Sequence, residues 1–262
     1  MELTLLDQSK DKLNLSFILK GASPSMANAL RRTIIDAVPT LAIEDVEISQ
    51  NSSILYDEML AHRLGLIPLT TDLETYEIAS KCKCKGEGCA NCQVKFTLQA
   101  KGPGVVYSEN VKFVDPKVTP AYGKMVIANL DKGQEIELQG TAILGQGKDH
   151  MKFSPGLVYY KYKPVLSIKS QPDDVDKMVE VCPKDIFENN KGKLEINKDK
   201  VLTCHLCEAC IEANSDVVSL EEKENEHVFY IESFGQLSAG NMVTKAISMI
   251  TENVDEFSKA LK

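Results

Sequence analysis

The sequence predicts an α+β fold in which the two ends of the chain form one discontinuous domain around an inserted, β-rich middle. Three observations predict it. A strand pattern followed by an amphipathic helix opens the chain, and the same order closes it. The stretch 44–167 reads mostly as strands and turns, and a short cysteine-bearing segment precedes the final strand. We therefore expect the two ends to pack together.

The first forty residues contain the opening strand and helix. LNLSFILKG reads as the strand, Ser23 is suited to cap a helix, and Pro24 suits the first helical position. Pro39 ends the segment. The apolar residues of this helix share one face, and they are Ala27, Leu30, Ile34 and Ala37.

The closing strand is HVFYIES, and a long helix follows from about Ser238. Between the two ends, VKFTLQA, KMVIANL and EIELQGTAIL have the alternation or β-branched content of strands. The apolar residues of the closing helix follow a helical period, and they are Val243, Ala246, Ile247, Ile250, Val254, Phe257 and Leu261.

Composition narrows the functional classes. The 262 residues are 43% hydrophobic and 26% charged, as in ordinary soluble globular proteins. No apolar run is long enough for a membrane span, and the N-terminus lacks the layout of a signal peptide, so we expect a cytoplasmic protein without membrane contact. The net charge of −8 argues against a free-standing, sequence-specific nucleic-acid binder. In the cytoplasm, cysteines indicate metal ligation before disulfides.

The second cysteine group consists of Cys182, Cys204, Cys207 and Cys210. CHLCEAC has the Cys-x-x-Cys-x-x-Cys spacing of bacterial-type ferredoxins, but Asn214 stands where their Cys-Pro would follow. In two-cluster ferredoxins each Cys-Pro ligates the cluster of the other half, and Cys182 is followed by proline. The cysteines needed for a first cluster are absent, so one four-iron cluster with Cys182 as fourth ligand is predicted.

Other interpretations of the second cysteine group remain open. A three-iron cluster held by Cys204, Cys207 and Cys210 is one variant. A four-cysteine zinc site, or buried thiols without a metal, would fit the same residues.

The first cysteine group consists of Cys82, Cys84, Cys89 and Cys92. KCKCKGEGCANCQ places four thiols within eleven residues, which permits a closed tetrahedral zinc site. Two disulfides or four free thiols are the alternatives. The sequence contains no phosphate-binding loop, nucleophile elbow or His-Glu-x-x-His motif, so we expect no catalytic residues in this chain.

Four segments resemble the α-type assembly subunits of multisubunit RNA polymerases. MANALRRTIIDAVPTLAIEDVEI is similar to their first helix, and LAHRLGLIPL and GQGKDHMKFSPG are similar to two further signatures. FYIESFGQLSAGNMVTKAI resembles their closing strand and helix. A ferredoxin-like insert before the closing strand points to the archaeal branch of the family, whose counterparts are the bacterial α subunit and the eukaryotic third-largest subunit.

The resemblance implies three domains: a dimerisation domain of residues 1–43 plus 221–262, an inserted β-rich domain of residues 44–167, and a ferredoxin-like iron–sulfur domain of residues 168–220. It implies subunit L as the partner in a heterodimer, with subunits N and P completing a platform for the large catalytic subunits. In this family the nucleotidyl-transfer chemistry belongs to the large subunits.

The same resemblance suggests which residues bind partners. Arg31, Arg32, His62 and Arg63 are candidate contacts with the large subunits. The apolar stripes suggest the remaining candidates, which are Leu30, Ile34, Val243, Ile247 and Ile250; alternatively, both stripes cover the sheet of this chain. A rival function is a ferredoxin-type electron carrier or redox-enzyme subunit, but such a protein needs neither a large β-rich domain nor the Ala-Leu-Arg-Arg helix.

Overall fold

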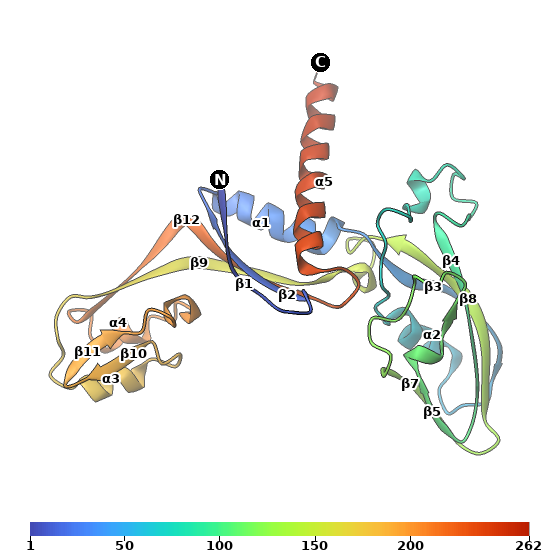
Figure 1. Cartoon of the computed structure of the whole chain (residues 1–262), viewed down its shortest axis with the longest axis horizontal. Coiled ribbons are helices and arrows are strands. Elements are labelled where there is room, and N and C mark those ends of the chain that lie inside the picture. Colours follow the sequence, from blue (N-terminus) through green and yellow to red (C-terminus); the bar gives the residue numbers. More distant parts are fainter. Residues whose placement is uncertain (262) are drawn as a thin grey trace. The chain divides into compact units, whose positions relative to one another are not determined.

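The computed structural model describes residues 1–261, which form two compact units (Figure 1). Each unit combines segments that are distant in the sequence. The first consists of Met1–Asp7, Ser16–Ala29 and Tyr159–Tyr230, and the second of Gln8–Leu15, Leu30–Val158 and the chain from Ile231 onward.

Strands from both ends of the chain share one four-stranded sheet, in the order β1-β2-β12-β9. The two inner strands come from opposite ends of the sequence. Phe17 of β2 stacks on Phe229 of β12, with ring centroids 5.1 Å apart. The strands are β1 (Glu2–Gln8), β2 (Asn14–Lys20), β9 (Gly156–Ile168) and β12 (Val218–Ser233).

The helices that follow the terminal strands begin where the sequence predicts. Helix α1 (Pro24–Arg32) starts after Ser23, whose hydroxyl accepts a hydrogen bond from the Met26 N–H at 3.3 Å. Helix α5 (Ala239–Ala260) starts after Ser238, whose hydroxyl accepts from the Asn241 N–H at 3.3 Å. Both serines satisfy donors that the first helical turn leaves unpaired, and both predicted starts are confirmed.

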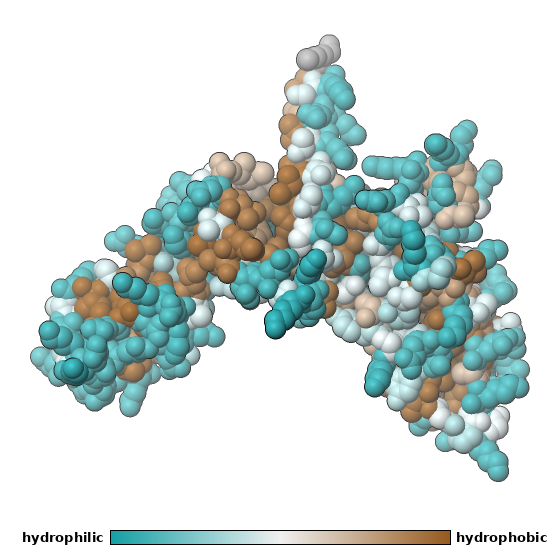
Figure 2. Space-filling model, viewed as in Figure 1, coloured by the Kyte–Doolittle hydropathy of each residue, from teal (hydrophilic) through white to brown (hydrophobic). Residues whose placement is uncertain are grey.

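Helix α5 buries only the first part of its apolar stripe. Met242, Val243 and Ala246 are buried, whereas every residue from Thr251 to Leu261 is exposed. Figure 2 shows hydrophobic residues along one edge of α5 and hydrophilic residues along the other. The stripe therefore continues beyond the part that packs against this chain.

The middle of the chain builds its own β-rich core in the second unit. On β4, Val94, Phe96 and Leu98 are buried, as the alternation predicts, and they pack with Leu60 and Leu64 of α2 in one apolar cluster. One sheet has the order β3-β8-β4-β6, and β5 pairs with β7. The elements are β3 (Thr40–Asn51), α2 (Asp57–Gly65), β4 (Gln93–Lys101), β5 (Gly104–Tyr107), β6 (Lys112–Phe113), β7 (Val126–Leu130) and β8 (Glu135–Gly145).

The cysteine-bearing segment between β9 and β12 forms a small helix-and-hairpin substructure in the first unit (Figure 1). Its elements are α3 (Val175–Val181), β10 (Phe187–Asn190), β11 (Lys193–Ile196) and α4 (Ala209–Ala213). Its core is correspondingly small and contains Val175, Met178, Phe187, Leu194, Cys210, Val217 and Val218. Short helical turns elsewhere are η1 (Thr33–Ala37), η2 (Ala79–Lys81), η3 (Ser108–Asn110), η4 (Met151–Phe153) and η5 (Val201–Thr203).

Strand β1 and helix α2 are two of the elements that the sequence did not predict individually. Strand β1 carries exposed leucines, including Leu3 and Leu5, and has no clear alternation of buried and exposed residues. Helix α2 lies within a stretch expected to contain strands and turns. No helix within residues 1–261 is long and apolar enough to cross a membrane.

We predict that Gly140→Ala destabilises the second unit. A Cβ atom on Gly140 would overlap the Asp45 carbonyl oxygen and lie 2.8 Å from the Phe96 ring, next to a register shift in the β3–β8 pair. Such overpacking costs about 1–3 kcal/mol. Thermal unfolding should therefore begin several degrees lower, at about 2–4 °C for each kcal/mol.

The matched control is Gly240→Ala in the first turn of α5, where a Cβ atom would meet nothing within 4 Å. This variant should melt at or slightly above the wild-type temperature because alanine favours helix. Equal melting curves for the two variants would contradict the steric argument.

Candidate metal centres and partner surface

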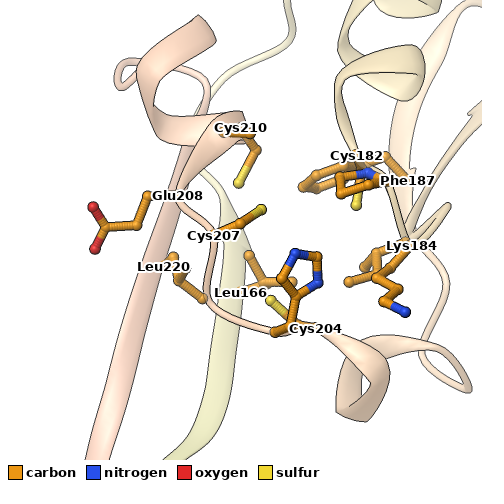
Figure 3. A pocket seen from close by; sticks show the side chains of 13 residues that line it. Leu166, Cys182, Lys184, Phe187, Cys204, Cys207, Glu208, Cys210 and Leu220 are labelled. Atoms are coloured by element: carbon orange, nitrogen blue, oxygen red, sulfur yellow. The ribbon is translucent and has the colours of Figure 1, made fainter.

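The second cysteine group lines a single pocket in the first unit. Cys182 follows α3, Cys204 follows η5, Cys207 lies in the next loop, and Cys210 belongs to α4. Figure 3 shows the four sulfur atoms around one common space, with the carboxylate of Glu208 directed away from it. The structure thus brings together all four residues that the sequence selected.

The thiols of this pocket affect one another electrostatically. Burial raises the pKa of the Cys210 thiol, and Cys204, Cys182 and Cys207 raise it further. Burial likewise raises the pKa of Cys204, although a hydrogen bond from the Leu206 backbone opposes this effect. Thiolates gathered in this pocket would repel one another, so a positively charged metal centre suits the donor set.

The backbone of the CHLCEAC loop bends in a way that non-glycine residues rarely adopt. Leu206 and Glu208 have φ values of 59° and 61°, on either side of Cys207. Alternation of left-handed residues with others turns backbone N–H groups toward a common concave side, as at many iron–sulfur sites. The loop therefore has both the sulfur ligands and the backbone geometry suited to an anionic cluster.

The first cysteine group is far more compact. Its four Sγ atoms all lie within 4.8 Å of one another. Within residues 1–261 it is the one set of three or more such ligand atoms gathered closely enough for a single ion. The second cysteine group is spaced more widely than this.

The sulfur separations in the first group fit a shared ion. The Sγ atoms of Cys82 and Cys89 lie 3.5 Å apart, those of Cys84 and Cys92 lie 3.5 Å apart, and those of Cys89 and Cys92 lie 3.8 Å apart. A zinc–sulfur bond of about 2.3 Å gives a tetrahedral edge of about 3.8 Å. A disulfide would require about 2.05 Å, and all four cysteines are free thiols.

One thiol of the first group is prepared for metal binding. Desolvation acts to raise the pKa of Cys84, but hydrogen bonds from the Gly86 and Gly88 backbone and from the Cys82 and Cys92 side chains together outweigh it and lower the pKa to about 6. Because the thiolate is the form that ligates metals, Cys84 is available as a ligand at neutral pH. The four-cysteine cluster is therefore able to hold a metal.

The predicted apolar partner residues divide into a buried and an accessible set. Leu30, Ile34 and Val243 are at most 6% exposed, so they pack within this chain and are not accessible to a partner. The sequence period identified a stripe correctly but gave no information about what covers each part of it. Ile247 is 46% exposed, and Ile250 is half-buried beside it.

The predicted basic contacts also differ from one another. Arg63 forms hydrogen bonds within the second unit. Its guanidinium donates to the carbonyl oxygens of Ile127 at 2.8 Å and Val126 at 2.7 Å. Arg32 is exposed and forms an ion pair of 3.5 Å with Asp36.

Arg31 and His62, which precede these two arginines in the sequence, differ in burial. Arg31 is half-buried, whereas His62 is exposed on α2. Arg63 thus holds α2 against β7 while remaining exposed itself, and both α2 candidates are accessible.

Two residues beside the second cysteine group escaped the sequence analysis. Lys161 and Tyr230 each donate a hydrogen bond to the backbone just before Cys204. For Lys161 the one available signal was the segment YYKYKP, in which a strand places Tyr159, Lys161 and Lys163 on one face.

A family model and the full-length relatives of this chain point to the same protein family. The family model of the RNA polymerase Rpb3/RpoA insert domain matches residues 46–156. DNA-directed RNA polymerase subunit Rpo3 of Methanosarcina acetivorans is 38% identical over 259 residues, which cover 98% of this chain and 96% of that protein. The Rpo3 subunits of Archaeoglobus fulgidus and Pyrococcus furiosus are 35% and 32% identical, over 100% of this chain and 98% and 97% of those proteins. The chain therefore belongs to the Rpo3 family of archaeal DNA-directed RNA polymerase subunits, within the wider Rpb3/RpoA family.

Proposed function

We propose that this chain is a non-catalytic assembly subunit of the polymerase. It pairs with subunit L, and together with subunits N and P the pair forms the platform for the large catalytic subunits in the cytoplasm. The observation that carries this proposal is the uncovered apolar face of α5. Catalysis is assigned to the large subunits, because no catalytic motif was found in this sequence.

The exposed part of α5 is suited to a permanent partner. Val254, Phe257 and Leu261 are 59%, 66% and 72% exposed, and they continue the stripe that Val243 and Ala246 begin inside the chain. Fully burying a side chain of this kind contributes about 1.5–3 kcal/mol. Obligate interfaces resemble a domain core cut in half. The apolar face of α5, which is buried near the start of the helix and exposed near its end, fits that description.

We further propose the domain roles that the family implies. The chain ends, residues 1–43 and 221–262, form the dimerisation domain, and the cysteine-bearing residues 168–220 form a ferredoxin-like domain. For the inserted domain we place the C-terminal end near Gly156 rather than at residue 167, because β9 belongs to the sheet of the chain ends. The family match, which ends at residue 156, supports this boundary.

We assign one iron–sulfur cluster to the second cysteine group. The four thiols line one pocket, and their spacing exceeds that of a single-ion site. A bound cluster would supply a covalent cross-link between Cys182 and the CHLCEAC loop. Because the core of this substructure is small, metal-binding free energy then becomes folding free energy, and the role is structural. To the first cysteine group we assign one zinc ion.

The first prediction concerns the pairing with subunit L. Phe257→Glu places a charge in the proposed interface, and the loss of about 3 kcal/mol would weaken binding about 100-fold. Lys259→Glu, which adds the same side chain to the opposite side of α5, is the control and should bind normally. Co-expression with subunit L followed by size-exclusion chromatography with light scattering measures the 1:1 complex. A wild-type chain that stays a well-behaved monomer beside subunit L would contradict the proposal.

The second prediction concerns the cluster. Cys204→Ser should abolish the brown colour and the bound iron and should unfold the segment 168–220, while binding of subunit L persists. Cys182→Ser should do the same for a four-iron cluster but leave a three-iron cluster in place. Iron analysis and electron paramagnetic resonance distinguish these results. Cys89→Ser, in the other cysteine group, is the control and should keep its iron.

The third prediction concerns zinc. Native mass spectrometry should detect one zinc ion per chain, and Cys89→Ser should lose it, since the Cys89 sulfur lies 3.5 Å and 3.8 Å from two of its partners. Cys204→Ser should retain this zinc. A metal-free chain that contains two disulfides would overturn the assignment.

A further inference from the structure

A lysine and a tyrosine of the sheet hold the backbone that leads into the second cysteine group. The Lys161 ammonium donates to the carbonyl oxygens of Leu202 at 2.6 Å and Cys204 at 2.5 Å. The Tyr230 hydroxyl donates to the same Leu202 oxygen at 3.1 Å. We name these four residues the carbonyl clamp.

Both donors of the carbonyl clamp lie on strands of the four-stranded sheet. Lys161 belongs to β9 and Tyr230 to β12, which are neighbours in the sheet. The Tyr230 ring stacks on Tyr159 at 5.0 Å, and the Lys161 ammonium lies 5.5 Å from the centre of the Tyr230 ring. Because both donors are fixed by the sheet, they also fix where the Cys204 backbone can lie.

The charge of Lys161 lacks a carboxylate partner. Lys161 is half-buried, yet within the part of the chain that the structure describes it forms no ion pair with Asp or Glu. Lys163, two residues along the same strand and on the same face, pairs with Glu226 at 2.7 Å. A partly buried ammonium whose partners are neutral carbonyl groups and an aromatic ring is costly unless an anionic group lies nearby.

The second cysteine group supplies that anionic group. Cys204, whose carbonyl oxygen accepts from Lys161, contributes its sulfur to the pocket shared with Cys182, Cys207 and Cys210. Four thiolates outweigh the positive charge of the iron–sulfide core, so the cluster as a whole is negative. Lys161 does not line the pocket itself, but its ammonium lies on the backbone of Cys204, whose sulfur does.

We propose that Lys161 is a positioning residue for the iron–sulfur cluster: through the Leu202 and Cys204 carbonyls it fixes the first cysteine of the CHLCEAC loop, and its charge offsets that of the cluster. The proposal rests on the cluster assigned above. It makes Lys161 a determinant of how tightly the cluster is retained and of its reduction potential, since nearby charge and hydrogen bonding set that potential.

The test uses the full chain, purified with its cluster and in complex with subunit L. Lys161→Met removes the charge and two hydrogen bonds, whereas Lys161→Arg keeps a charged donor. Tyr230→Phe removes one hydrogen bond and keeps the charge and the ring stack. Lys163→Met is the matched control, because Glu226 retains Lys223 at 3.1 Å.

Two measurements separate the positioning role of Lys161 from the effect of its charge. The first is the rate at which a chelator bleaches the cluster: Lys161→Met should lose it about 10-fold faster than wild type, as typically follows the loss of an outer-sphere partner. Lys161→Arg should restore most of the retention, Tyr230→Phe should lie between, and Lys163→Met should match wild type. The second is the reduction potential, which should fall in Lys161→Met alone, because the reduced cluster loses a positive neighbour.

The results that would overturn the proposal are distinct from those that would overturn the cluster. A wild-type chain without iron would remove the cluster and the positioning role together. With iron present in the wild type, an unchanged bleaching rate in Lys161→Met would overturn the positioning role alone. Faster bleaching without a change in potential would reduce Lys161 to a packing residue. If Lys161→Met retains too little iron to measure, Tyr230→Phe provides the rate, and a wild-type rate there would count against the clamp.

Discussion

The rest of the structure depends on the pairing of β2 with β12. These strands come from opposite ends of the sequence, and the backbone hydrogen bonds Gly21 N–H to Asn225 and Ser233 N–H to Leu13 mark the two ends of their pairing. About two hundred residues lie between them, so the entropy of closing that loop opposes the contact, although this cost grows only slowly with loop length. Stacked rings and a shared sheet offset this cost, and the intervening chain forms an insert and a cysteine-bearing substructure.

The two cysteine groups differ in how much of the chain a bound metal would connect. The first is local: all four sulfurs come from one short loop, so a metal there stabilises that loop and little else. The second is divided, with Cys182 on one side of the β10–β11 hairpin and the other three cysteines beyond it. A centre bound by both parts closes the hairpin into a folded unit, and this is why a domain with so small a core is expected to depend on it.

The sequence was most informative where one local signal determines one local structure. Ser23 and Ser238 predicted helix starts because a hydroxyl at that position satisfies unpaired N–H groups, and cysteine spacing identified every thiol that lines the pocket. The sequence was least informative about side chains whose burial or bonding depends on a partner that is distant in the chain. Leu30 and Val243 belong to real apolar stripes, but only the packing reveals that this chain buries them itself. Lys161 likewise looks like an ordinary strand lysine, because its partners are carbonyl groups some forty residues away in the chain.

The two proposed roles of the chain, assembly and cluster binding, fall on residues of different compact units. Helix α5 belongs to the second unit and the second cysteine group to the first, so the face proposed for subunit L does not include the pocket. The strand that both depend on is β12, which carries Tyr230 of the clamp and ends at Ser233, shortly before α5 begins at Ala239. Loss of the proposed cluster would therefore release the backbone around Cys204 first. Its effect would extend to the surface proposed for subunit L only if β12 itself separated from β2, which the stacked rings of Phe17 and Phe229 oppose.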